Sequence, residues 1–218
     1  MLFRSDALKR VAIQLATEYC NLCSHVIAPS ESIANLLVER RVNAPVTAIP
    51  TGIDTIAFSN ADGAAFRQIH GIGADAIVIG HVGRLAAEKN LGFLTEAVSR
   101  VIAEHPEAIF LLVGDGPEKD TIVQHIAPRN LIATGSLHGD ELAAAYAAMD
   151  FFVFASQSET QGMVLAEAMA AGVPVVALDG PGVREIVSDG ENGMLLDGDA
   201  DVPAFVEALV RFVSENDF

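Results

Sequence analysis

Two glutamates eight residues apart, Glu159 and Glu167, form the pattern in this sequence with the clearest chemical potential. Residues 163–171 are predicted to form a helix, so Glu159 lies in the loop before it and Glu167 lies about two turns away on the same side. Carboxylates at two depths suit the hydroxyl groups of a sugar and a ribose, because a hydrogen bond to a charged group contributes about 1.5–3 kcal/mol. The alternative is that Glu159 only stabilises the helix start and Glu167 faces solvent.

A second pattern places two cations, Arg84 and Lys89, on the glycine-containing loop 83–90. Cations are scarce in a chain with a net charge of −16, and a pair of them can hold a diphosphate, for which arginine offers a bidentate contact. They would also stabilise the negative charge that develops on a departing diphosphate. The alternative is an exposed arginine beside a solvated ion pair between Glu88 and Lys89.

Short apolar stretches alternate with amphipathic ones, which predicts an α/β fold with a doubly wound parallel sheet of the Rossmann type. The apolar stretches are rich in Val, Ile and Phe, as in strands buried on both faces. We expect strands at residues 26–28, 46–49, 77–82, 109–113, 131–134, 151–154, 175–177 and 194–196. We expect helices at residues 6–23, 31–40, 91–104, 118–126, 140–149, 163–171 and 202–213, and one short helix within residues 40–75.

The loops after four of the expected strands contain glycine, at Gly83, Gly114–Gly116, Gly135 and Gly162. Ligands of such sheets bind at the carboxyl ends of the strands, and glycine lets the backbone approach them closely. The loops therefore predict a nucleotide site along one edge of the sheet, whereas no G-x-G-x-x-G motif supports NAD. We expect His81 to be a core or rim histidine with its hydrogen bonds satisfied.

The composition argues against several other classes of protein. The acidic charge disfavours nucleic acid as a partner, and no apolar run is long enough to span a bilayer. The start of the chain lacks the apolar core of a signal peptide, and two cysteines are too few for a disulfide scaffold, so we expect a reducing cytoplasm. Cys20 and Cys23 offer only half of a zinc ligand set, so we expect two partly buried thiols and no metal site.

These motifs together resemble the C-terminal, donor-binding domain of the family 4 glycosyltransferases, also called glycosyl transferases group 1, which have the GT-B fold. The matching stretches are, in order, VIAPSESIANLL, IPTGIDTIAF, HVGRLAAEKNLGFL, LLVGDGPEKD, TGSL, SETQGMVLAEAMAAGVPVVA and GVREIVSDGENGMLL, covering about four-fifths of the chain. Many relatives have Ser-Phe-Gly where this chain has Thr160-Gln161-Gly162, so its contacts with the sugar are expected to differ.

The resemblance assigns roles to individual residues. It implies that Arg84 and Lys89 hold the diphosphate of a nucleotide sugar and that Glu167 binds the ribose hydroxyls. It implies that Glu159 faces the transferred sugar as a positioning or charge-stabilising group. The remaining substrate-binding residues that it implies are Gly83, Asp115 and Gly116 along the cleft, Gly135, Ser136 and Leu137 beside the base, and Gln161, Gly162, Met163 and Val164 at the sugar and phosphate.

The resemblance also implies the activity of the longer protein. Residues 1–24 would be the end of a missing acceptor-binding domain or its linker, and residues 25–218 the nucleotide-sugar-binding domain. The expected enzyme is a retaining hexosyltransferase that uses a nucleoside diphosphate sugar, UDP by preference, without a metal or other cofactor. Its acceptor would be a lipid or a cell-envelope glycan, reached from the cytoplasm with peripheral membrane contact through the missing half. The alternatives are a nucleotide-sugar epimerase of the same fold and a non-catalytic nucleotide-binding domain.

Overall fold

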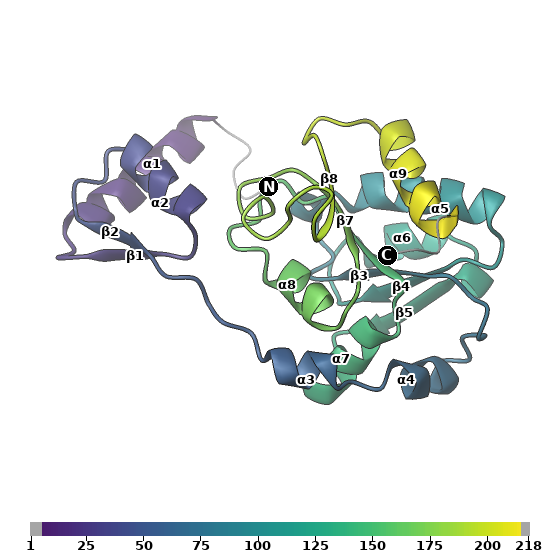
Figure 1. The fold of residues 1–218 in the computed structure, drawn as a ribbon. Coiled ribbons are helices and arrows are strands. Elements are labelled where there is room, and N and C mark those ends of the chain that lie inside the picture. The colour runs from purple at the N-terminus through teal and green to yellow at the C-terminus, as the bar shows by residue number, and fades with distance from the viewer. Residues whose placement is uncertain (1–5, 215–218) are drawn as a thin grey trace.

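The computed structural model describes residues 6–214. Residues 1–5 of the predicted segment 1–24 and residues 215–218 of the predicted domain 25–218 lie outside the described part. Figure 1 shows a large α/β body and a smaller N-terminal lobe. The elements are α1 (Asp6–Asn21), β1 (Val26–Ala28), α2 (Glu31–Glu39), β2 (Val46–Ala48), α3 (Thr55–Ser59), α4 (Gly63–Ile69), β3 (Val78–Val82), α5 (Leu91–Glu104), β4 (Ile109–Val113), α6 (Lys119–His125), β5 (Leu131–Gly135), α7 (Gly139–Ala147), β6 (Phe151–Phe154), α8 (Met163–Ala170), β7 (Val175–Leu178), β8 (Gly193–Leu196) and α9 (Val202–Ser214). Two short 3-10 helices lie at Ala87–Lys89 and Pro128–Asn130.

The large body is built on a six-stranded sheet in which every neighbouring pair is parallel, in the order β5-β4-β3-β6-β7-β8. The chain enters at β3 in the middle, moves outward through β4 to β5, and then crosses back to β6. The predicted doubly wound sheet is therefore confirmed. The reversal of direction falls between β3 and β6, and the crevice at such a reversal is where sheets of this kind bind ligands.

Helices cover both faces of this sheet, because each strand is apolar on both sides. One cluster of buried side chains joins the sheet to α5, α6 and α9, with Leu94, Ile122 and Phe205 among its members. The other joins the opposite face to α4, α7 and α8. The strands thus present near-continuous apolar sequence, and β3, β4 and β6 have nearly all of their residues buried.

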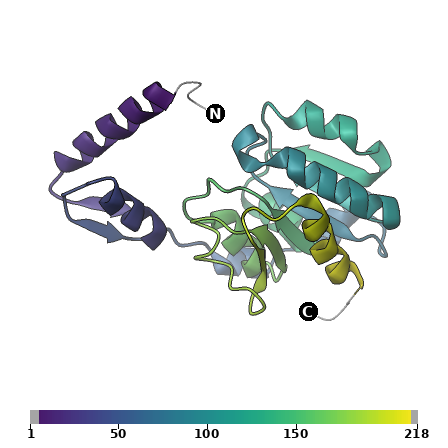
Figure 2. The same cartoon turned by 90° about the horizontal axis from the view of Figure 1, so that it is seen from above.

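The N-terminal lobe, residues 6–48, consists of α1, α2 and a separate two-stranded parallel sheet of β1 and β2. Figures 1 and 2 both show it beside the large body, joined to it by the chain that leads to α3. None of the described residues of this lobe belongs to either of the two buried clusters above. The strands of the two sheets thus lie in separate parts of the chain, up to β2 and from β3 onward. The predicted domain boundary between residues 24 and 25 stays a prediction.

Residues 49–77 form the connection between the lobe and the first strand of the large sheet. The prediction of one short helix here is wrong, because two helices form, α3 and α4. Each has its own aspartate at the N-cap: Asp54 accepts a hydrogen bond from the N–H of Ala57, and Asp62 from that of Ala65.

Among the helices of residues 6–214, none is both long and apolar enough to cross a bilayer.

Candidate functional site

The glycine loops at the carboxyl ends of β3, β4 and β5 pack backbone against backbone. The N–H of Gly114 donates to the carbonyl oxygen of Gly135 at 2.8 Å, which joins the ends of β4 and β5. A β-carbon at Gly114 would overlap the carbonyl oxygen of Gly83, and one at Gly116 would overlap that of Leu85. Glycine is required at both positions, and the predicted residues of these three loops form one continuous rim.

The loops after β3 and β6 meet at the reversal point of the sheet. The hydroxyl groups of Ser156 and Ser158 both donate to the carbonyl oxygen of Glu88, at 3.2 Å and 3.3 Å. The ammonium group of Lys89 lies 2.9 Å from a carboxylate oxygen of Glu159, although 70 residues separate the two in sequence. The structure therefore brings one predicted cation and one predicted carboxylate into direct contact.

The two predicted cations differ in accessibility and in partner. The side chain of Lys89 is only 21% exposed and that of Glu159 17%, whereas the side chain of Arg84 is 67% exposed. Arg84 forms an ion pair with Glu88 on its own loop. The alternative of a solvated Glu88–Lys89 pair is therefore wrong in its partners: Glu88 pairs with Arg84, and Lys89 pairs with Glu159.

Glu159 is held by neighbours that favour its ionised form. Partial burial acts to raise the pKa of its carboxyl group, but the hydrogen bond and charge of Lys89 and the backbone N–H groups of Thr160 and Gly162 lower that pKa below its usual value. The N–H of Thr160 lies 3.1 Å from the carboxylate. The alternative that Glu159 only stabilises the start of the helix is therefore incomplete. Glu159 accepts backbone hydrogen bonds near the start of α8, but it also forms an ion pair with Lys89.

The turn from Gln161 to Val164 leads directly into α8. Gly162 is the N-cap residue with φ of +72°, a conformation that glycine adopts without strain. The first N–H groups of α8, including those of Met163 and Val164, have no acceptor within the helix and carry the positive end of its dipole. This turn is therefore suited to an anion or to hydroxyl oxygens.

Glu167 has a different partner from Glu159. Its carboxylate accepts a hydrogen bond at 2.8 Å from the hydroxyl of Tyr146, which is fully buried on α7. Burial raises the pKa of Glu167, and the hydrogen bond from Tyr146 opposes that rise. Sequence analysis missed Tyr146, although a buried tyrosine hydroxyl needs a partner and this one follows a run of alanines typical of close helix packing.

The predicted base-contacting loop lies at the outer strand of the rim. Ser136 is exposed, and Leu137 packs partly against the core on the α7 side. Asp115, on the adjacent loop, is exposed and accepts a hydrogen bond from the N–H of Gly116. Among the described residues, no hydrogen bond or ion pair joins either loop to Glu159, so these residues border the candidate site without contacting its Lys89–Glu159 pair.

The interpretation of His81 as a satisfied histidine is only half right. It is fully buried in β3, and its Nδ1 lies 3.1 Å from the carbonyl oxygen of Val153, but its Nε2 has no hydrogen-bond partner among the described residues. Burial lowers its pKa to about 4, and the nearby charge of Lys89 adds to that, so the ring is neutral at pH 7. Cys20 and Cys23 are free and partly buried, as expected.

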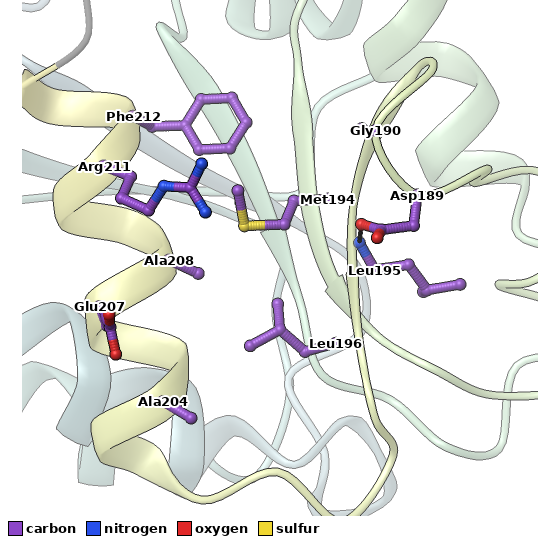
Figure 3. A pocket seen from close by; sticks show the side chains of 11 residues that line it. Asp189, Gly190, Met194, Leu195, Leu196, Ala204, Glu207, Ala208, Arg211 and Phe212 are labelled. Atoms are coloured by element: carbon purple, nitrogen blue, oxygen red, sulfur yellow. Dashed lines mark hydrogen bonds between the residues drawn. The ribbon is translucent and has the colours of Figure 1, made fainter.

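A hollow of about 450 Å³ lies elsewhere, between β8 and α9 (Figure 3). Its lining includes Met194, Leu196, Arg211 and Phe212, and none of the predicted site residues. Because it borders the last strand of the sheet rather than the carboxyl ends of β3 and β6, we assign the candidate site to the rim and not to this hollow.

A doubly wound parallel sheet with helices on both faces defines an α/β domain of the Rossmann class. The chain belongs to the family described as "Glycosyl transferases group 1", whose model matches residues 76–215. A second model, "Glycosyltransferase Family 4", matches residues 2–56. The resemblance of the motifs to this family is thereby confirmed.

Several relatives illustrate the similarity. The chain is 29% identical over 201 residues to alpha-monoglucosyldiacylglycerol synthase of Acholeplasma laidlawii, covering 88% of this chain and 50% of that protein. It is 31% identical over 202 residues to the protein of the same name in Streptococcus pneumoniae, covering 88% of this chain and 46% of that one. The chain thus spans about half the length of these relatives.

The solved structures similar to this chain include glycosyltransferases of the GT-B fold. Anabaena HepE in complex with UDP and glucose aligns with a TM-score of 0.82 and 27% identity, over 95% of this chain and 58% of that one. The C-terminal domain of a Francisella tularensis glycosyl transferase group 1 protein aligns with a TM-score of 0.65 and 25% identity, over 76% of this chain and 89% of that one. The fold is therefore that of one half of a GT-B enzyme.

Proposed function

We propose that this chain carries the donor-binding half of a retaining glycosyltransferase that uses a nucleoside diphosphate sugar. The observation that carries the proposal is the contact of Lys89 with Glu159 where the loops after β3 and β6 meet. Residues 25–218 would hold the donor, and the acceptor would bind to a preceding domain of the longer protein, for which residues 1–24 supply the final segment. UDP is the proposed nucleotide, which is also the one in the complex of the similar HepE.

The geometry supports a separate binding role for each group of site residues. The diphosphate would lie against the Gly83 loop and the start of α8, within reach of Arg84 and Lys89. Glu167 would accept hydrogen bonds from the ribose hydroxyls, and the base would lie along the main chain of residues 135–137. Glu159 would then face the sugar, where its depressed pKa keeps it anionic.

The proposed reaction breaks the bond between the anomeric carbon and the diphosphate oxygen. Negative charge develops on that oxygen as the bond lengthens, and Arg84 and Lys89 stabilise it together with the N–H groups at the start of α8. Positive charge develops at the sugar ring, and the carboxylate of Glu159 stabilises that. The acceptor hydroxyl attacks the same face of the sugar and passes its proton to the departing diphosphate oxygen as the new bond forms, which retains the anomeric configuration. No metal or other cofactor takes part in this proposal.

The acceptor class follows from relatives whose names refer to lipids, such as alpha-monoglucosyldiacylglycerol synthase. We propose a lipid or cell-envelope glycan acceptor and a cytoplasmic enzyme with peripheral membrane contact through its other half. The isolated chain would bind nucleotide and transfer sugar poorly or not at all. Efficient transfer by these 218 residues alone would contradict the domain assignment.

The test is titration calorimetry of the chain with UDP and with GDP. We expect UDP to bind, and we expect Arg84→Ala and Glu167→Ala each to weaken binding by about 1–3 kcal/mol, since each removes charged hydrogen bonds. The absence of heat with both nucleotides would favour a non-catalytic domain. Unchanged affinity in both variants would place the site elsewhere. Conversion of the bound nucleotide sugar to its epimer, without an acceptor, would favour the epimerase alternative.

A further inference from the structure

The N-terminal lobe is held against the large body by polar contacts at one end of α2. Since none of its described residues belongs to the two buried clusters, apolar packing within them does not hold the lobe in place. Hydrogen bonds connect this end of the lobe to the large body instead. The start of α2 donates to Glu185, and Ser30 donates to Thr160. Nearby, the side chain of Gln161 donates to the carbonyl oxygen of Thr51 in the linker.

Glu185 caps a helix that belongs to the other part of the molecule. Its carboxylate accepts hydrogen bonds from the backbone N–H groups of Glu31 at 3.0 Å and Ser32 at 2.6 Å, the first two residues of α2. These N–H groups have no acceptor within α2, and the helix dipole favours a negative charge at this end. Burial acts to raise the pKa of Glu185, but the hydrogen bonds from Ser32, Glu31 and Ser30 together lower that pKa below its ordinary value.

The same contact reaches the turn that carries Glu159. Ser30, the N-cap residue of α2, is buried, and its hydroxyl donates to the carbonyl oxygen of Thr160 at 2.7 Å. The segment that carries Glu185 packs on this turn too, because the N–H of Gly182 donates to the carbonyl oxygen of Glu159 at 3.1 Å. A β-carbon at Gly182 would lie 2.5 Å from the backbone nitrogen of Gln161, so no side chain separates the two segments.

The geometry points to Glu185 as a positioning residue that couples the N-terminal lobe to the sugar-facing turn. By holding the start of α2, it keeps Ser30 on Thr160 and thereby fixes the backbone between Glu159 and Gln161. The inference rests on the proposed function, in which Glu159 faces the sugar. It adds that the correct placement of Glu159 depends on Glu185 and on α2 of the lobe, neither of which is among the proposed donor-binding residues.

The first test asks whether the contact exists in solution. Hydrogen exchange of the amides of Glu31 and Ser32 is expected to be slow in the unaltered chain, and to accelerate at least tenfold in Glu185→Ala, because the variant removes both acceptors. Glu185→Gln keeps the side-chain length and one acceptor, so an intermediate rate is expected. Glu191→Gln, which neutralises another exposed acid on the following loop, is the matched control and is expected to leave both rates unchanged. Equal exchange rates in the unaltered chain and Glu185→Ala would overturn the contact.

The second test uses the enzyme with its complete N-terminal half and separates binding from turnover. We expect Glu185→Ala to lower kcat roughly tenfold, with UDP affinity by calorimetry changed less than twofold, and Glu185→Gln to recover part of the loss. Ser30→Ala is expected to act on the same step, so that the double variant loses less than the product of the two single losses. If the unaltered enzyme did not bind UDP, the proposed function would fail. If it bound UDP and Glu185→Ala transferred sugar at the normal rate, only the positioning role would fail.

Discussion

The turn before α8 and the helix α8 itself each carry a glutamate, and the two side chains have opposite electrostatic surroundings. In the turn before α8, Glu159 meets a cation and backbone N–H groups, and the pKa of its carboxyl group is lowered. Within α8, Glu167 meets apolar packing and one tyrosine hydroxyl, and its pKa is raised. The comparison shows that the eight-residue spacing does not create an equivalent pair of carboxylates. It creates one carboxylate whose ionised form is favoured by its neighbours and one whose ionised form is disfavoured by burial.

The largest expected effect comes from removing the charge of the first carboxylate. In the enzyme with its complete N-terminal half, Glu159→Gln is expected to lower turnover about a hundredfold, because positive charge at the sugar ring loses its stabilising anion. UDP should bind at least as tightly, since Lys89 is released from its pair and can serve the diphosphate alone. Initial rates at saturating donor and titration calorimetry measure the two quantities.

Glu207→Gln makes the same chemical change on the exposed side of α9 and serves as the control. Its rate and affinity are expected to match those of the unaltered enzyme. Near-normal turnover of Glu159→Gln would contradict the proposal that the charge of Glu159 supports the reaction. A marked loss of UDP affinity would show that Glu159 contributes to nucleotide binding instead.

The turn between the two regions can be tested through its glycine. Gly162→Ala is expected to lower the free energy of unfolding by about 2–3 kcal/mol, because it combines strain at positive φ with a close contact. A β-carbon there would lie 2.6 Å from the carbonyl oxygen of Gly182. Gly172→Ala is the matched control, since Gly172 has φ of +76° but nothing within 4 Å of its β-carbon position, and about 1 kcal/mol is expected. Equal losses in urea denaturation would show that the 159–162 turn is not fixed by this packing.

The effect of the Tyr146 hydroxyl on Glu167 can be tested with Tyr146→Phe. Loss of the hydroxyl is expected to raise the pKa of Glu167 further and to cost about 1 kcal/mol of stability. The ribose hydroxyls need the ionised carboxylate, so UDP affinity should fall more at pH 6 than at pH 8 when the variant is titrated. Tyr19→Phe, on an exposed tyrosine of α1, supplies the control. A loss of affinity that is equal at both pH values would separate Tyr146 from the ionisation of Glu167.

The smallest effects concern stability and have opposite signs. A carboxyl group whose pKa is lowered on folding stabilises the protein above its unfolded pKa, and that contribution is lost as the pH falls through the folded value. Glu159→Gln should therefore lower Tm at pH 7 and lose that effect near pH 3. A raised pKa stabilises the folded state only at low pH, so Glu167→Gln should raise Tm at pH 7 and have no effect near pH 4. Each change is expected to be below about 1 kcal/mol, because both groups are partly solvated. Thermal melts in which both variants shift Tm in the same direction would contradict the contrast.

Much of the fold could be predicted because local signals and tertiary structure agree. The bounds of β4 and β6 match the apolar stretches that predicted them, since strands buried on both faces leave continuous apolar runs. The bounds of β1 match too, although only Ala28 of that strand is buried. The region of α3 and α4 could not be predicted as well, because two helices of five and seven residues carry little periodicity. Their aspartate N-caps, Asp54 and Asp62, were the signal that could have revealed them.

The sequence singled out individual residues of the candidate site, but it did not indicate which of them would contact one another. The glycines and the scarce cations marked the loops, yet nothing in the sequence indicated that Lys89 would contact Glu159 or that Glu88 would contact Arg84. Arg84 and Glu88 lie four residues apart on one loop, whereas the Lys89–Glu159 contact depends on β3 and β6 becoming neighbours, which is a property of the whole sheet. Glu185 was missed for the same reason, because its partners lie more than 150 residues away.

The close approach of Gly114 to Gly83 and of Gly116 to Leu85 has a consequence for changing the donor preference of this domain. At these positions the rim consists of main chain alone, with no room for a side chain that could distinguish one base from another. A change in nucleotide preference would have to come from residues that tolerate other side chains, such as the exposed Ser136 and the partly exposed Leu137 in the outer loop. The inner rim would behave as a fixed frame, and a library of substitutions at Gly114 or Gly116 would return unfolded proteins rather than new specificities.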